Sequence, residues 1–233
     1  TAGAGFALTV AAAYGSVDGQ LPQMLCAFAG ALGAVLLVYA VGRTSPLHLL
    51  LAGTALSALL MGINLGIRLM DSSTLDKYRF WSVGSLAGRE QIGLTAPIIL
   101  IIVCLAGAVI LTRSLSALTL GEQVATTLGI RVGQTRGLVI LLVTVLTATA
   151  TAVAGPIAFV GLIVPHLVRR ISSGSVGWLI AFSLVGGPAL MILSDILARV
   201  LLPTGEVPVA IVTAFLGAPM LVWVVRRYGV APL

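Results

Sequence analysis

The chain has 233 residues, of which 59% are hydrophobic and 9% charged, with a net charge of +6 and a mean hydropathy of +1.15. A soluble domain is about a quarter charged, so this composition excludes an ordinary soluble protein. Long unbroken apolar blocks without polar–apolar alternation exclude a membrane β-barrel. The composition therefore indicates a multi-pass α-helical membrane protein, because crossing a hydrocarbon core of roughly 30 Å takes about 20 apolar residues in a helix.

Apolar blocks follow one another along the whole chain and predict its helices. They cover residues 2–13, 21–42, 46–69, 93–112, 137–154, 157–168, 179–202 and 207–225. The block at 157–168 is too short for a crossing and contains Pro165 just after Pro156. Since proline removes a backbone donor and ends or kinks a helix, we expect this helix to lie buried among its neighbours.

Small residues recur at helical spacing in the second block, at Ala27, Gly30 and Ala34, and again near Gly186. Such residues let helix backbones approach closely, so we expect packing contacts there. Cys26 and Cys104 lie in apolar blocks without a paired spacing, and we expect both to be free thiols.

Basic residues gather in alternate connections between the blocks. This set consists of Arg43, Arg113, Arg131, Arg136, Arg169, Arg170, Arg226 and Arg227. An excess of arginine marks the cytoplasmic side, which places both ends of the chain in the cytoplasm. The same pattern explains the net charge without nucleic acid, since the chain has no basic run or aromatic-interleaved basic patch.

The connection from Arg113 to Arg136 is predicted to hold a short helix of about nine residues outside the membrane. Thr119 and Glu122 have the spacing of a capping box, and Gly129 suits the position just after the helix. An apolar stripe is formed by Leu120, Val124 and Leu128. From the residues alone, a docking element and a helix lying on the lipid surface are equally good interpretations.

The outer segment 71–92 mixes charges with Tyr78, Phe80 and Trp81, which favours a helix lying flat at the membrane interface. Asp195 and Arg199 are four residues apart and predict an intrahelical ion pair. His166 is interpreted as a packing residue.

No catalytic motif and no intramembrane carboxylate pair occurs in the sequence, so an enzyme is disfavoured. An ion-coupled secondary transporter usually carries acidic residues at mid-membrane, where Asp195 alone is weak support. A protein with this organisation can instead take its energy from a partner.

The segment Ala154–Ile171, Ala-Gly-Pro-Ile-Ala-Phe-Val-Gly-Leu-Ile-Val-Pro-His-Leu-Val-Arg-Arg-Ile, resembles the signature of FecCD-type permeases, the iron–siderophore and vitamin B12 branch of ABC importers. Further blocks resemble the family in order and spacing: Leu51–Leu60, Trp81–Gly88, Leu120–Ile130, Ser194–Arg199 and Glu206–Pro219. The stretch Ser172–Trp178 departs from the charged sequence usual in the family at this point.

The resemblance implies an all-α polytopic transmembrane helix bundle, the type II ABC importer permease, with about eight of the family's ten helices in this chain. We expect residues 1–233 to form a single transmembrane permease domain, with the N-terminal helices missing. The expected partners are a second permease subunit (identical or related), two cytosolic ATPase subunits, a periplasmic or lipoprotein substrate-binding protein, and membrane lipid. No cofactor or metal is expected.

Residue roles follow from the same resemblance. The ATPase-coupling residues would be Leu120, Gly121, Glu122, Val124, Leu128 and Gly129. Arg199 would dock the binding protein besides pairing with Asp195, and Trp81, Ser85, Gly155 and Pro156 would lie at the pathway or its gate.

The predicted function is therefore the permease subunit of an ATP-driven importer of iron–siderophore complexes in the bacterial inner membrane. The alternative hypothesis for the substrate is cobalamin or haem, imported by a permease of the same family. An ion-coupled secondary transporter is the alternative from another class.

Overall fold

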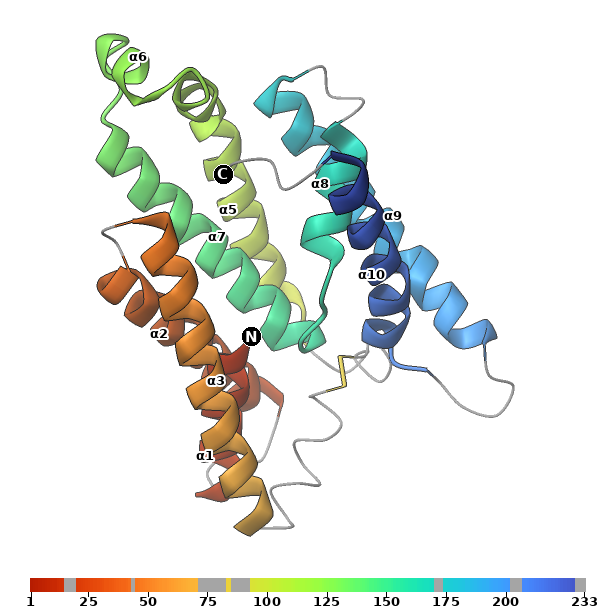
Figure 1. The fold of residues 1–233 in the computed structure, drawn as a ribbon. Helices are drawn as coiled ribbons and strands as arrows, with labels where there is room; N and C mark the ends of the chain where they lie inside the picture. Colours follow the sequence, from red (N-terminus) through yellow and green to blue (C-terminus); the bar gives the residue numbers. More distant parts are fainter. Residues whose placement is uncertain are drawn as a thin grey trace. The chain divides into compact units, whose positions relative to one another are not determined.

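The computed structural model describes residues 1–14, 20–42, 45–70, 83–84, 93–169, 174–201 and 207–228. In this part of the chain the regular structure is entirely helical (Figure 1). The helices are α1 (Ala2–Ala13), α2 (Gln20–Gly42), α3 (Pro46–Met70), α5 (Thr95–Leu118), α6 (Glu122–Thr127), α7 (Val132–Ala154), α8 (Val160–Arg169), α9 (Val176–Val200) and α10 (Val209–Tyr228). The all-α prediction is confirmed.

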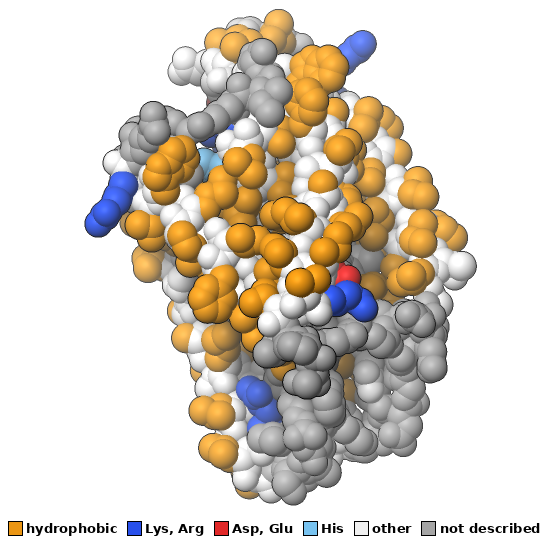
Figure 2. All heavy atoms as spheres, turned by 90° about the vertical axis from the view of Figure 1, so that its right-hand side faces the viewer, with side chains coloured by type: hydrophobic (Ala, Val, Ile, Leu, Met, Phe, Trp, Pro, Cys, Tyr) orange, Lys and Arg blue, Asp and Glu red, His pale blue; other side chains and the backbone are white. Residues whose placement is uncertain are grey.

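Five of the described helices are long and apolar enough to cross a membrane. They contain Pro22–Gly42, Leu47–Met70, Thr95–Leu118, Val132–Ala154 and Val176–Val200. Hydrophobic side chains are spread over the described part of the face shown in Figure 2, and many large ones on α3, α5, α9 and α10 are exposed. A surface of this kind requires lipid or protein partners around it.

The chain divides into two compact units. One comprises Thr1–Val83, Gly88–Leu105 and Ile140–Pro156, and the other Gly84–Ala87, Ala106–Val139 and Ile157–Leu233. α5 and α7 each contribute residues to both units. The single transmembrane domain stays a prediction.

In the first unit, α1, α2 and α3 pack side by side (Figure 1). α1 and α2 touch through Gly3 and Gly30, where a Cβ on either glycine would overlap the other's carbonyl oxygen. Ala27 and Ala31 are buried next to this contact. The small residues therefore pack the backbones directly together, as their spacing predicted.

In the second unit, α8 packs against both α9 and α10. A Cβ on Gly186 of α9 would lie 3.1 Å from Val164 Cγ1 of α8. α8 buries one face, with Ile163, Val164 and Val168, although Pro165 lies inside the helix. The helix therefore packs among its neighbours with one face buried, while its opposite face is exposed in the described chain.

Candidate functional site

The short helix between α5 and α7 begins differently from the prediction. Gly121 is its N-cap, with φ of 104°, and no side chain caps the helix. Thr119 Oγ1 instead donates a hydrogen bond of 2.7 Å to the Ser116 carbonyl at the end of α5. The predicted capping box was therefore wrong: the Thr119 hydroxyl group bonds back to α5, as threonine side chains commonly do near a helix end, and Gly121 occupies the N-cap instead.

The end of α6 is a Schellman motif. Gly129 has φ of 80°, its N–H donates to the Thr126 carbonyl at 3.0 Å, and the Ile130 N–H donates to the Ala125 carbonyl at 3.0 Å. A left-handed residue at this position favours glycine. The predicted place of Gly129 is confirmed, and α6 turns sharply towards α7 after only six residues.

The apolar stripe of this segment points away from its own chain. Leu120, Val124 and Leu128 are 65%, 44% and 63% exposed, whereas Ala125 is fully buried. Apolar side chains exposed on a short, sharply bounded helix form a surface suited to a protein partner.

An ion pair joins α6 to α7. Arg136 Nη2 donates to Glu122 Oε1, and both side chains are more than half exposed. An exposed pair of this kind contributes about 0–1 kcal/mol to stability. Sequence reasoning did not find Arg136 as the partner, because fourteen residues and a turn separate it from Glu122.

The two ionisable residues of α9 are in contact. Arg199 Nε donates to Asp195 Oδ2 at 2.9 Å, and the side chains of Arg199 and Asp195 are 52% and 26% exposed. The pair lies in the last two turns of α9, with half of the arginine still accessible. A role for Arg199 in binding another protein stays a prediction.

Of the four residues expected at the pathway or its gate, the structure describes two. Trp81 and Ser85 lie outside the described residues. Gly155 and Pro156 lie in a non-helical segment between α7 and α8, and Gly155 has φ of 79°.

Phe159 ends that segment, and sequence reasoning missed it. Its φ of 68° makes it the single described non-glycine residue with a positive φ, a conformation that costs about 1–2 kcal/mol for a residue with a Cβ. Phe159 sits against Gly217 of α10, where any Cβ would overlap its side chain. A glycine inside a helix costs about 1 kcal/mol, so Gly217 was the available signal of a close approach.

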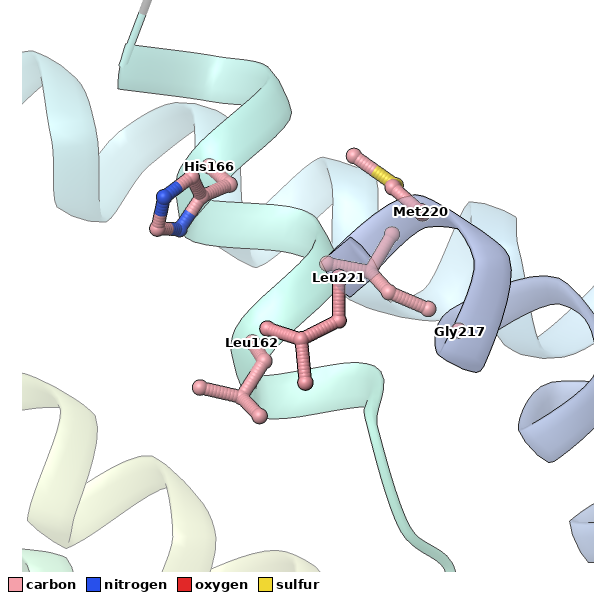
Figure 3. Close-up of a pocket in the computed structure, with 6 residues that line it drawn as sticks. Leu162, His166, Gly217, Met220 and Leu221 are labelled. Atoms are coloured by element: carbon pink, nitrogen blue, oxygen red, sulfur yellow. The ribbon is translucent and has the colours of Figure 1, made fainter. Parts of the chain in front are cut away.

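A small pocket lies between α8 and α10. Its lining consists of Leu162, Ile163, His166, Gly217, Met220 and Leu221 (Figure 3). The described residues contain no cluster of three or more His, Cys, Asp or Glu side chains that could hold a metal ion. The pocket is almost entirely apolar, and the packing interpretation of His166 stays a prediction.

The sequence matches the FecCD transport family over residues 1–227. It is 42% identical over 231 residues to the ferric enterobactin transport system permease protein FepD of Escherichia coli K12, covering 97% of this chain and 69% of that protein. It is 37% identical over 212 residues to the Fe(3+) dicitrate transport system permease protein FecD of the same organism, covering 89% and 67%.

A solved structure supports the same relationship. A metal-chelate type ABC transporter in an inward-facing conformation has 30% sequence identity and a TM-score of 0.87, covering 97% of this chain and 74% of that one. This agreement confirms the predicted ABC-permease fold, a multi-pass membrane protein and a transport subunit in place of an enzyme. The chain belongs to the FecCD transport family.

Proposed function

We propose that the chain is the membrane-spanning permease subunit of an ATP-driven importer of iron–siderophore complexes in the bacterial inner membrane. The observation that carries the proposal is the 42% identity to a ferric enterobactin permease over 97% of the chain. The dicitrate permease, at 37% identity, transports another ferric chelate by its name. The substrate class is therefore a ferric chelate, with an iron–siderophore complex as the preferred member.

The energy would come from a separate ATPase bound at α6. The exposed stripe of Leu120, Val124 and Leu128 supplies an apolar contact surface. Gly121 and Gly129 supply the left-handed turns that bound it, and Glu122 ties it to α7. ATP binding closes two ATPase subunits, and their motion reaches the membrane helices through this segment.

Recognition of the substrate would be left to a binding protein on the outer side. Arg199 keeps half of its side chain exposed beside Asp195, so an acidic group of a partner can approach its guanidinium. The second permease subunit, identical or related, would complete a central pathway. Gly155 and Pro156, together with Trp81 and Ser85, would line that pathway or its gate.

Cobalamin or haem is the second candidate substrate class. The cobalamin import system permease protein BtuC of Halobacterium salinarum is 35% identical over 211 residues, and the hemin transport system permease protein HmuU of Yersinia pestis is 35% identical over 212 residues. Both identities are below those of the two ferric-chelate permeases.

The proposal is tested by uptake into proteoliposomes that hold the full-length permease with its ATPase and binding protein. Labelled ferric siderophores are offered beside cobalamin and haem. We expect uptake of a ferric siderophore that requires both ATP and the binding protein. ATP-dependent uptake of cobalamin or haem alone would assign the other substrate class.

In a secondary transporter, uptake would depend on the proton gradient and not on ATP. Uptake that persists without ATP, collapses with the proton gradient and is lost in Asp195→Asn would contradict the ATP-driven function. In the proposed importer, Asp195→Asn leaves ATP dependence intact and weakens only the contact that orients Arg199.

A further inference from the structure

Two residues with a positive φ bound the non-helical segment that separates α7 from α8. α7 ends at Ala154 and α8 begins at Val160, with Gly155 at φ of 79° and Phe159 at φ of 68° on either side of the gap. Glycine adopts this conformation freely, but phenylalanine does not. Something outside the segment therefore holds Phe159 in its present conformation.

Gly217 of α10 provides that restraint. A Cβ placed on Gly217 would overlap Phe159 Cβ and would lie 2.5 Å from Phe159 Cγ and 3.0 Å from its Cδ1. The base of the aromatic ring thus lies directly on the α10 backbone, in a place that only glycine leaves open. Gly217 also borders the small apolar pocket, together with Leu162 and Leu221 (Figure 3).

The sequence of the gap is compatible with a second conformation. If Phe159 adopted the right-handed helical conformation, α8 could begin at Pro156 with Gly155 as its N-cap. Proline is favoured at the first helical position, and glycine is tolerated at the N-cap. The four added residues would lengthen α8 by about 6 Å.

We propose that Phe159 and Gly217 form a latch that controls the length of α8. With the ring seated on Gly217, the Gly155–Phe159 segment is non-helical. When the ring leaves Gly217, the segment joins α8 and carries Gly155 and Pro156 into a different geometry. The use of this switch in a transport cycle rests on the proposed function, whereas the switch itself is a property of this chain.

Two substitutions at one position test the latch. Phe159→Ala and Phe159→Gly both delete the ring, but alanine is the best helix former and glycine one of the poorest. Alanine also disfavours the left-handed conformation, which glycine accepts. The latch therefore predicts a longer α8 in Phe159→Ala and an interrupted segment in Phe159→Gly.

The measurement is amide hydrogen exchange of the peptide covering residues 155–163, in the full-length permease assembled with its ATPase in lipid nanodiscs. In the present structure the Val160 N–H already donates to the Ala158 carbonyl at 3.0 Å. Extension of α8 would give the N–H groups of Val160 and Gly161 helical partners at Pro156 and Ile157. We expect their exchange to be at least about fivefold slower in the alanine variant than in the glycine variant, the ratio set by helix propensity alone. Equal exchange in the two variants would overturn the latch and leave Phe159 as a packing residue.

Substitution of the other partner gives an independent check. Gly217→Ala places a methyl group where the ring lies, so it should release the ring and slow exchange as Phe159→Ala does. Gly187→Ala in α9 is the matched control, because no atom lies within 4 Å of its added Cβ. If Gly217→Ala does not assemble, the Phe159 pair still decides the question.

The role in transport is tested separately in the wild-type complex. Binding of a non-hydrolysable ATP analogue should change exchange of residues 155–163. Unchanged exchange in a complex that shows ATP-driven uptake would overturn the transport role of the latch. Absence of ATP-driven uptake would contradict the proposed function instead, and the result from the two Phe159 variants would stand.

Discussion

Gly3 and Gly30 bring the backbones of α1 and α2 into direct contact. Apolar helices gain little from burial when their alternative surroundings are lipid, so close packing carries much of their association. A Cβ added to either glycine would lie 2.3 Å from the carbonyl oxygen of the other, so a glycine Cα hydrogen is directed at that oxygen in its place. Such contacts add a weak attraction of about 0.5–1 kcal/mol each.

Gly30→Ala should therefore force α1 and α2 apart. Its Cβ would overlap the Gly3 carbonyl oxygen and the Ala7 side chain, and overpacking of this kind costs roughly 1–3 kcal/mol. We expect a lower apparent melting temperature in detergent. It is measured by size-exclusion chromatography of protein samples heated to increasing temperatures. Gly33→Ala on the same helix is the control, since no atom lies within 4 Å of its Cβ. Equal melting temperatures for both variants would contradict the described contact.

The sequence predicted this contact but not the one at Phe159, for a physical reason. Ala27, Gly30 and Ala34 repeat within one helix, so their common face is visible from spacing. Phe159 has a positive φ and lies against Gly217, which belongs to a helix distant in the sequence. Gly217 inside a helix signals a close approach, but the local pattern does not identify Phe159 as its partner. The capping box failed for a local reason, because the Thr119 hydroxyl group had a competing acceptor three residues earlier, at Ser116.

Among the elements, α6 was located correctly but its length was not. The stripe of Leu120, Val124 and Leu128 marks its position, while the helix spans only Glu122–Thr127. α5 and α7 run past Arg113 and Arg136, where the apolar blocks end. A helix satisfies its own backbone hydrogen bonds in water as well as in lipid, so it can extend beyond the membrane. The length of an apolar block therefore reflects the thickness of the membrane and not the full length of the helix.

If α6 docks the ATPase, a charge placed on the apolar side of this helix should weaken ATPase binding, whereas the same charge on the opposite side should not. Val124→Asp places an unpaired carboxylate in the apolar stripe, and burying it against a partner should weaken ATPase binding by roughly tenfold or more. Thr126→Asp adds the same charge on the opposite side of the helix and should leave binding nearly unchanged. The measurement is the affinity of the purified ATPase for the permease in nanodiscs. Equal losses would show that the stripe is not the contact surface.

For the whole molecule, composition alone was enough to assign the membrane class and the helical architecture. The orientation rests on the arginines around α6 and at the ends of α8 and α10. The exposed apolar side chains of α3, α5, α9 and α10 cannot be divided between lipid and protein by sequence. Lipid and a neighbouring subunit present equally apolar surroundings, so hydropathy does not distinguish them.

Cysteine labelling tests the orientation. Cys26 and Cys104 are first replaced by alanine, and single cysteines are introduced as Gln123→Cys in α6 or Leu201→Cys at the end of α9. A membrane-impermeant thiol reagent should label the first only in inside-out vesicles and the second only in right-side-out vesicles. Both native thiols are free, so their removal breaks no disulfide. The reverse labelling pattern would invert the assigned topology.

The ten residues of α8 are too few to enter a bilayer unaided. At about 1.5 Å per residue they span about half of the hydrocarbon core. The insertion machinery would therefore not recognise α8 as a separate span, and the helix must be drawn in by α9 and α10 after these have been synthesised. In this part of the protein, the later helices α9 and α10 would then insert before the earlier helix α8. Nascent chains that stop before α10 should leave α8 outside the membrane.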